Sequence, residues 1–225
     1  MTRPRLIATG RDADVFAIDA DRVLRRYRDG GGVAAEAAVM VHVAGYGFPV
    51  PAVHRAEGAD LIMARVPGPT MLTALRTAGI DTPAAARTLA ELHRRLHLIP
   101  ARESHDPAAR VLHLDLHPDN VLLGDRGPVV IDWRNTREGP PELDTAMSAL
   151  ILAQAAVGGD PGLAAPARAL LAAFLREVDG EPSRGLDDAV AMRAADPNST
   201  GQELADLSRA GALVREMLDA SVSDG

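Results

Sequence analysis

The stretch from His113 to Leu123 reads His-Leu-Asp-Leu-His-Pro-Asp-Asn-Val-Leu-Leu, and it decides the fold. It is apolar but studded with charged and amide side chains. The Val/Ile run at residues 129–131 then predicts a buried strand that ends at Asp132, nine residues after Leu123. Charges flanked by buried strands are costly unless they are paired or bind a metal. Carboxylate and amide oxygens suit Mg²⁺, together with substrate phosphates, so the segment predicts a strand–loop–strand hairpin that binds magnesium.

The spacing His113-x-Asp115-x-x-x-x-Asn120, followed by Asp132, resembles the catalytic loop and metal aspartate of the kinase-like phosphotransferases. Within that superfamily it is similar to the aminoglycoside phosphotransferase and choline kinase branch. The Leu-His-Pro-x-Asn stretch, and Asp-Trp in place of Asp-Phe-Gly, are typical of these small-molecule kinases. Only 11 residues separate Asp132 from Asp144, which leaves no room for the activation loop of a protein kinase.

The resemblance implies an α+β, two-lobed protein kinase-like fold. A small N-terminal antiparallel sheet with one helix would precede a larger, mainly helical C-terminal lobe. Pattern and punctuation agree with this. Strands are expected at residues 6–8, 15–18, 23–27, 53–56 and 61–66, and helices at 33–44, 81–98, 143–157, 162–178, 186–194 and 202–218. We expect a nucleotide-binding lobe at 1–66, a catalytic and substrate-binding lobe at 67–225, and a hinge at about 63–69.

The resemblance also implies the roles of the central residues. Asp115, with His113 beside it in the motif, belongs to the catalytic set, and Asp115 would accept a proton from the attacking hydroxyl or orient it. Asn120 and Asp132 would hold Mg²⁺ against the phosphates of ATP or GTP. The implied activity is an ATP- and Mg²⁺-dependent transfer of the γ-phosphate to a hydroxyl of a small molecule.

A second group of residues would bind the nucleotide. Arg25 occupies the strand position that normally carries the phosphate-pairing lysine, and Glu36 matches its ion-pair partner on the following helix. Arg25 is preferred over Arg26 because neighbouring strand residues face opposite ways. The segment Thr9–Phe16 stands where a nucleotide-covering hairpin belongs.

The hinge segment Met63, Ala64, Arg65 and Val66 would offer backbone groups to the base. This assignment, too, follows from the resemblance, since the stretch is similar to the hinge of small-molecule kinases.

Composition limits the chemistry further. All 24 basic residues are arginine, and the chain has neither lysine nor cysteine. Lysine-based Schiff bases, a P-loop lysine, thiol nucleophiles and thiolate zinc sites are therefore excluded. The net charge of −7 argues against a nucleic-acid partner. No run reaches the roughly 20 apolar residues of a membrane span, and no signal peptide is recognisable, so we expect a cytoplasmic protein.

The acceptor is expected to be a small hydroxylated molecule. Residues 67–225 carry 15 arginines and 23 acids, a charge of −8 that is typical of a solvated surface and would also suit a cationic acceptor. Residues 151–225 carry no motif that would name the acceptor or the oligomeric state.

Two alternatives stay open. The first is a nucleotide-binding pseudokinase with little or no transfer activity, acting through a partner, because an arginine such as Arg25 is not a conservative replacement for lysine at a shaped site. The second is a metallohydrolase that would use the histidines at 113 and 117 as ligands. His93 and His97 have the spacing of a zinc pair, but the sequence shows no third ligand, so we expect a packed or surface role for them.

Overall fold

The computed structural model describes residues 4–10, 12–28, 30, 32–197 and 200–223. Its N-terminal part is an antiparallel five-stranded sheet in the order β1-β2-β3-β5-β4. The strands are β1 (Arg5–Thr9), β2 (Ala13–Ala17), β3 (Arg22–Tyr27), β4 (Val53–Glu57) and β5 (Asp60–Ala64), and one helix, α1 (Ala34–Gly45), lies between β3 and β4 in the chain.

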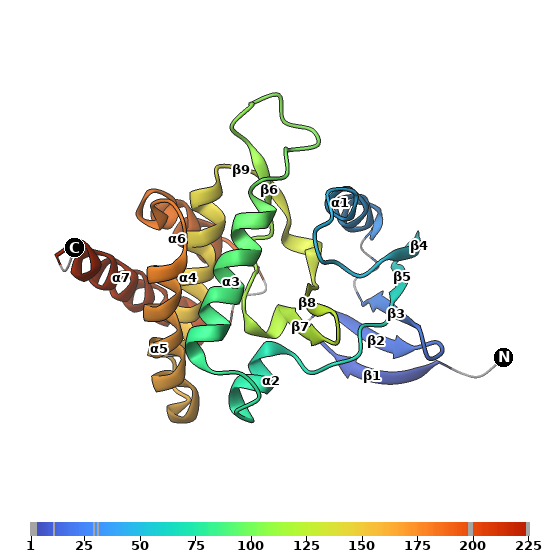
Figure 1. Ribbon diagram of the computed structural model, residues 1–225, viewed down its shortest axis with the longest axis horizontal. Coiled ribbons are helices and arrows are strands. Elements are labelled where there is room, and N and C mark those ends of the chain that lie inside the picture. The colour runs from blue at the N-terminus through green and yellow to red at the C-terminus, as the bar shows by residue number, and fades with distance from the viewer. Residues whose placement is uncertain (1–3, 11, 29, 31, 198–199, 224–225) are drawn as a thin grey trace.

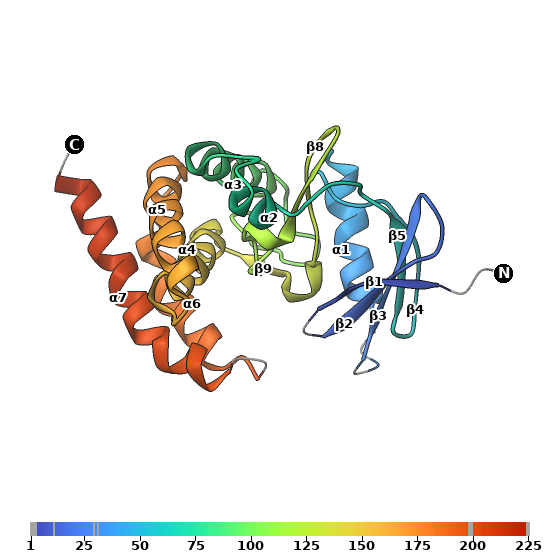
Figure 2. The ribbon, with the colours of Figure 1, turned by 90° about the horizontal axis from the view of Figure 1, so that it is seen from below.

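Helices dominate the rest of the chain. They are α2 (Met71–Arg76), α3 (Thr82–Leu96), α4 (Pro141–Val157), α5 (Pro161–Glu177), α6 (Leu186–Ala194) and α7 (Gly201–Ser223), with a 3₁₀ turn, η3 (Pro182–Gly185), before α6. Figure 1 shows these helices at one end of the molecule and the sheet with α1 at the other. Seen from below, α1 lies between the sheet and the middle of the molecule (Figure 2).

Two short strand pairs lie between these parts. They are β6 (Arg110–Leu112) with β9 (Arg137–Gly139), and β7 (Val121–Gly124) with β8 (Gly127–Val130). A 3₁₀ turn, η1 (Pro118–Asn120), leads into β7, and another, η2 (Trp133–Asn135), follows β8. The β7–β8 hairpin therefore joins the two halves of the motif, as the sequence predicts.

Local chemistry explains where the elements begin. The carboxylate of Asp81 caps α3 by accepting the N–H of Ala84 at 2.7 Å, and Pro83 fits the first turn of that helix. In β3 the side chain of Arg25 is buried and that of Arg26 is exposed, which follows from the alternation of strand residues.

One aromatic contact ties the motif to the N-terminal part. Trp133 is buried and packs edge-on against Phe48, at 5.6 Å between ring centroids. This contact joins η2 to the segment after α1.

The predicted α+β class, a small antiparallel sheet with one helix before a larger helical part, is confirmed, and the predicted strands and helices match observed ones to within a few residues. The sequence analysis missed α2 and the β6–β9 pair. These elements are six and three residues long, too short to show a periodic pattern. In the described part of the chain, no helix is both long and apolar enough to cross a membrane.

Candidate active site

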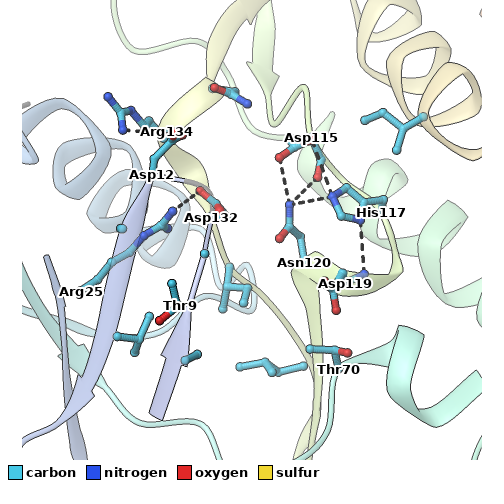
Figure 3. A pocket seen from close by; sticks show the side chains of 18 of the residues that line it. Thr9, Asp12, Arg25, Thr70, Asp115, His117, Asp119, Asn120, Asp132 and Arg134 are labelled. Carbon is cyan, nitrogen blue, oxygen red and sulfur yellow. Dashed lines mark hydrogen bonds and ion pairs between the residues drawn. The ribbon is translucent and has the colours of Figure 1, made fainter. Parts of the chain in front are cut away.

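A cleft of about 1070 Å³ lies between the sheet and the helices. The first three strands, the segment after β5 and both halves of the motif between His113 and Asp132 line it, and α4, α6 and α7 close its far side. Figure 3 shows the labelled side chains that face it, with Arg25 and Asp132 on one side and Asp115, His117 and Asn120 on the other. Arg11, in the hairpin expected to cover the nucleotide, lies outside the described residues.

The loop that carries Asp115 is fixed from behind. Leu114 has a positive φ of 60°, a conformation that costs a non-glycine residue free energy and therefore needs support. Asp144, in the first turn of α4, gives that support. Its carboxylate accepts the backbone N–H of His113 at 3.1 Å and that of Leu114 at 2.7 Å. The loop geometry thus depends on a fully buried carboxylate in another element.

Asn120 connects the two sides of the motif. Its Nδ2 donates to the backbone oxygen of Asp115 at 2.8 Å and to the carboxylate Oδ2 of Asp115 at 3.1 Å. These bonds hold the Asp115 side chain in the cleft. They also turn the amide oxygen of Asn120 away from Asp115, because the two ends of an amide point in opposite directions.

Asp132 lies between the end of β8 and the start of η2. Its φ of 67° is again left-handed, which is typical of strain kept at a functional site. Its Oδ1 accepts a hydrogen bond from Nη2 of Arg25 at 2.6 Å. The amide oxygen of Asn120 and the carboxylate of Asp132 both line the cleft and are hard oxygen donors, a set that fits Mg²⁺.

Arg25 joins three elements. Its Nη1 donates to Oε1 of Glu36 on α1 at 3.2 Å, while Nη2 reaches Asp132. Burial opposes the positive charge, but the carboxylates of Asp132 and Glu36 outweigh this and raise the pKa of Arg25. Arg26, by contrast, points outward and pairs with Asp60 at 2.6 Å.

Glu36 is held by two further donors. The hydroxyl of Tyr27 donates to Oε2 at 2.6 Å and the backbone N–H of Trp133 donates to Oε1 at 3.3 Å. Burial raises the pKa of Glu36, and Arg25 acts against that shift. Because burial also raises the pKa of Tyr27, its hydroxyl remains a proton donor.

Asp115 itself has an environment suited to a base. Burial raises the pKa of its carboxyl, although the neighbouring His117 and His113 act in the opposite direction. His117 lies 3.7 Å away, measured from Nε2 to Oδ1 of Asp115. A carboxylate whose pKa is raised in this way binds a proton more readily than a solvated one.

His113 does not reach the cleft, in contrast to its expected place in the catalytic set. It is completely buried. Its Nδ1 accepts the N–H of Asp115 at 3.2 Å, and its Nε2 donates to the oxygen of Ile131 at 3.1 Å. Both ring nitrogens are therefore used inside the protein, and burial lowers the pKa of the ring. His113 positions the loop against the end of β8 and cannot touch a substrate or serve as a metallohydrolase ligand.

The segment from Met63 to Val66, which the sequence analysis proposes as the base-binding hinge, lines the cleft. Two of its backbone N–H groups are already used, since Ala64 donates to Ala52 at 2.8 Å and Arg65 donates to the oxygen of Asp21 at 2.7 Å. A base at this edge would have to use the N–H of Val66 or the carbonyl oxygens.

The far side of the cleft was missed by the sequence analysis. It is formed by polar residues of α4, α6, α7 and the segment between the last two: Gln154, Arg193, Asp196, Glu203 and Asp206. The side chain of Arg193 donates to Gln154 at 3.2 Å and lies 3.8 Å from the carboxylate of Asp196. The acid excess after residue 66 was the one sequence signal that indicated such a surface.

The histidine pair at the end of α3, His93 and His97, also differs from expectation. His93 is buried, which agrees with a packed role, but a third potential ligand does exist. Oδ2 of Asp144 lies 3.0 Å from Nε2 of His97. The sequence could not show this because Asp144 comes from a different helix.

A family model described as a phosphotransferase enzyme family matches residues 4–110 and 100–186 of the chain. Among curated proteins, no match was found.

Solved structures resemble this chain over nearly its whole length. A thermostable mutant of aminoglycoside phosphotransferase APH(4)-Ia in its apo form has a TM-score of 0.65 and 15% identity, covering 98% of this chain and 95% of that one. The ternary complex of such a mutant with ADP and hygromycin B has a TM-score of 0.58 and 16% identity, covering 97% of this chain and 94% of that one. A choline/ethanolamine kinase family protein from Mesorhizobium loti has a TM-score of 0.61 and 15% identity, covering 97% of this chain and 92% of that one. At these identities the likeness establishes the fold.

Proposed function

The chain belongs to the phosphotransferase enzyme family, and from this premise we propose that it transfers the γ-phosphate of a Mg²⁺-bound nucleoside triphosphate to a hydroxyl of a small acceptor. The observation that carries the proposal is the placement of Asp115. Its carboxylate, held by Asn120, lines the same cleft as Asp132 and Arg25. Residues 1–66 would bind the nucleotide, and residues 67–225 would supply the catalytic groups and bind the acceptor.

The metal would be held by the amide oxygen of Asn120 and the carboxylate of Asp132. A Mg²⁺ ion bound there supplies positive charge that neutralises the nucleotide phosphates. Asp132 would exchange part of its contact with Arg25 for this role. Arg25 remains anchored by Glu36 and stays charged, so its guanidinium can contact the α- and β-phosphates from the sheet side.

Asp115 would act on the acceptor. It accepts the proton of the attacking hydroxyl while the new bond forms between that oxygen and the γ-phosphorus. The bond from this phosphorus to the bridging oxygen breaks, and the nucleoside diphosphate leaves with the electron pair. In phosphoryl transfer the protein mainly positions these groups and balances charge, so a few well-held residues suffice.

ATP or GTP would place its base at the segment from Met63 to Val66. ADP is present in one of the similar structures, the APH(4)-Ia ternary complex, which supports use of an adenine nucleotide. The backbone contacts already made by Ala64 and Arg65 would restrict the base to the remaining groups of that edge.

The acceptor would be hydroxylated and cationic. Three carboxylates, those of Asp196, Glu203 and Asp206, line the far side of the cleft together with the cation of Arg193. An amine-bearing molecule complements this excess of negative charge. Hygromycin B in the APH(4)-Ia complex supports a small-molecule acceptor.

The direct experiment is a panel of hydroxylated amines, hydroxylated neutral molecules and hydroxylated acids, incubated with the protein, ATP or GTP, and Mg²⁺. Mass spectrometry would detect the added phosphoryl group. We expect phosphorylated product from at least one amine, and none when Mg²⁺ is removed with a chelator. Binding of nucleotide without any product across the panel would contradict the proposal. An unchanged yield of product after the chelator has removed Mg²⁺ would also contradict it.

One observation favours the pseudokinase alternative. Arg25 contacts Asp132 at 2.6 Å, so the cation that replaces the usual lysine engages the oxygen that would face the metal. In a pseudokinase this contact would persist with nucleotide bound, and Mg-ATP would stabilise the protein without being consumed.

The Arg25→Lys variant separates the two functions. If the site is built around a guanidinium, the variant loses one of two charge-assisted contacts, and the transfer rate falls about tenfold to a hundredfold. If the wild type is a pseudokinase, the variant gains transfer that the wild type lacks. Arg26→Lys is the matched control, since Arg26 lies one residue along the strand, is exposed and pairs with Asp60 outside the cleft.

A further inference from the structure

Three side chains with metal-binding atoms meet behind the cleft. His93 lies in the last turn of α3, His97 is the C-cap residue directly after that helix, and Asp144 lies in the first turn of α4. Oδ2 of Asp144 is 3.0 Å from Nε2 of His97 and 3.5 Å from Nδ1 of His93. The three atoms lie within 4.8 Å of one another. None of them belongs to the proposed magnesium site.

The hydrogen-bond partners around His93 indicate which of its two ring nitrogens carries the proton. The hydroxyl of Ser148 donates to the oxygen of Leu116 at 2.7 Å, so its only proton is used. It must therefore accept from Nε2 of His93, which lies 2.9 Å away. In the neutral ring, the proton is then on Nε2, and Nδ1 carries only a lone pair.

That lone pair faces a carboxylate. In the described part of the chain, Nδ1 of His93 is the one buried side-chain nitrogen or oxygen without a hydrogen-bond partner. A lone pair that faces the anionic oxygen of Asp144 at 3.5 Å is repelled unless a cation lies between them.

The spacing fits a tetrahedral metal. Bonds of about 2.0–2.1 Å from Zn²⁺ to nitrogen or oxygen place neighbouring ligand atoms about 3.3 Å apart. The two distances to Oδ2 of Asp144 bracket that value. The ligands of a metal site are usually oriented by hydrogen bonds to other groups of the protein. Here Asp144 accepts the N–H groups of His113 and Leu114, and His93 is oriented by Ser148.

An access route is present. A surface pocket of about 230 Å³ is lined by both histidines together with Glu142, Thr145 and Asp179. Through it a metal could enter, and water could take the fourth position. The imidazole nitrogens distinguish this cluster from the oxygen-only set of the cleft, so it selects a zinc-like ion and not magnesium.

We propose that Nδ1 of His93, Nε2 of His97 and Oδ2 of Asp144 bind Zn²⁺, with a water from the adjoining pocket as the fourth ligand. The ion ties α3 to α4. It also holds the carboxylate that receives the backbone N–H groups of the catalytic loop, so it stabilises the loop without taking part in the reaction.

The test uses the full chain after treatment with a chelator. Zn²⁺ is added, excess is removed by desalting, and bound metal is measured by elemental mass spectrometry beside the melting temperature. We expect one zinc per chain and a higher melting temperature that a chelator reverses. We expect His97→Ala to lose the bound zinc and the rise in melting temperature. His54→Ala, which changes an exposed histidine on β4, should keep both properties.

Two further measurements keep the result decisive. His117→Ala removes the histidine of the cleft, and it should still bind one zinc; if it loses the metal while His97→Ala keeps it, the ion lies in the cleft and the proposal is wrong. Co²⁺ in place of Zn²⁺ reports coordination by its visible absorption in the folded protein. Absence of any bound zinc in the wild type would overturn the proposal and show that a proton, and not a metal, completes the cluster.

Discussion

Asp115 shows how a single residue is prepared for its proposed role. Its carboxylate is fixed by the amide of Asn120, and the loop before it rests on Asp144. Burial raises its pKa, because removal from water disfavours the charged form. The same environment that costs free energy in the folded state makes the group a stronger base toward an acceptor hydroxyl.

This shift predicts the pH dependence of transfer. A base must be unprotonated to act, so kcat/KM should rise with pH through the pKa of Asp115 in the free enzyme. Because that pKa is raised, the inflection should lie above the ordinary value of about 3.9 for aspartate. His117→Ala should move it higher still, since the histidine acts to lower the pKa of Asp115. A pH–rate profile checks this, and an inflection that moves to lower pH in the variant would contradict it.

The sequence predicted the residues of the motif and the choice of Arg25 over Arg26, because spacing and strand alternation are local properties of the chain. It did not predict which way His113 faces. A motif gives positions along the chain, whereas orientation depends on the packing of Trp133, whose ring lies 4.7 Å from that of His113. It also failed to show Asp144 beside His93.

At the scale of elements, the linker after β5 connects the sheet to the helical part and contacts the β7–β8 hairpin on its way. The oxygen of Pro69 accepts the N–H of Leu123 at 2.9 Å, so the linker runs against β7. Gly68 makes this approach possible. Its φ is 133°, and a Cβ at this position would lie 2.2 Å from the backbone oxygen of Leu123. No larger residue fits without moving the strand.

Gly68→Ala should therefore destabilise the protein by about 2 kcal/mol or more, through both the unfavourable φ and the clash. Urea unfolding would measure the loss. Gly127→Ala is the matched control, because Gly127 has a φ of 111° but a Cβ added there would meet nothing within 4 Å. Equal losses in the two variants would show that the close approach to Leu123 has no energetic weight.

Most elements could be predicted because glycine and proline mark their limits and because α3 carries a clear amphipathic pattern. The elements missed were held in place by distant partners. Strand β6 pairs with β9, and α2 packs against η1 and β7, which lie far along the chain. Such short segments carry too little pattern of their own to reveal a structure.

At the scale of the whole molecule, the cleft is assembled from segments spread along the chain. The side proposed to bind the nucleotide comes from residues before 70, and the acidic side comes from α4, α6 and α7. The motif predicted the side of the cleft that carries Asp115, Asn120 and Asp132. The acidic side could not be predicted, because Arg193 of α6 and Glu203 of α7 meet Gln154 of α4 only when these helices pack.

The proposed reaction depends above all on Asp115 acting as its base. The decisive comparison is between the wild type and Asp115→Asn, using an acceptor found in the panel. Asp125→Asn, which changes an exposed carboxylate in the β7–β8 turn, is the control.

We expect the Asp115→Asn variant to lose about 10²- to 10⁴-fold in transfer rate. It should keep the rise in melting temperature with Mg-ATP, and the control should keep both activity and binding. Transfer at the wild-type rate by Asp115→Asn would contradict the assignment of Asp115 as the base.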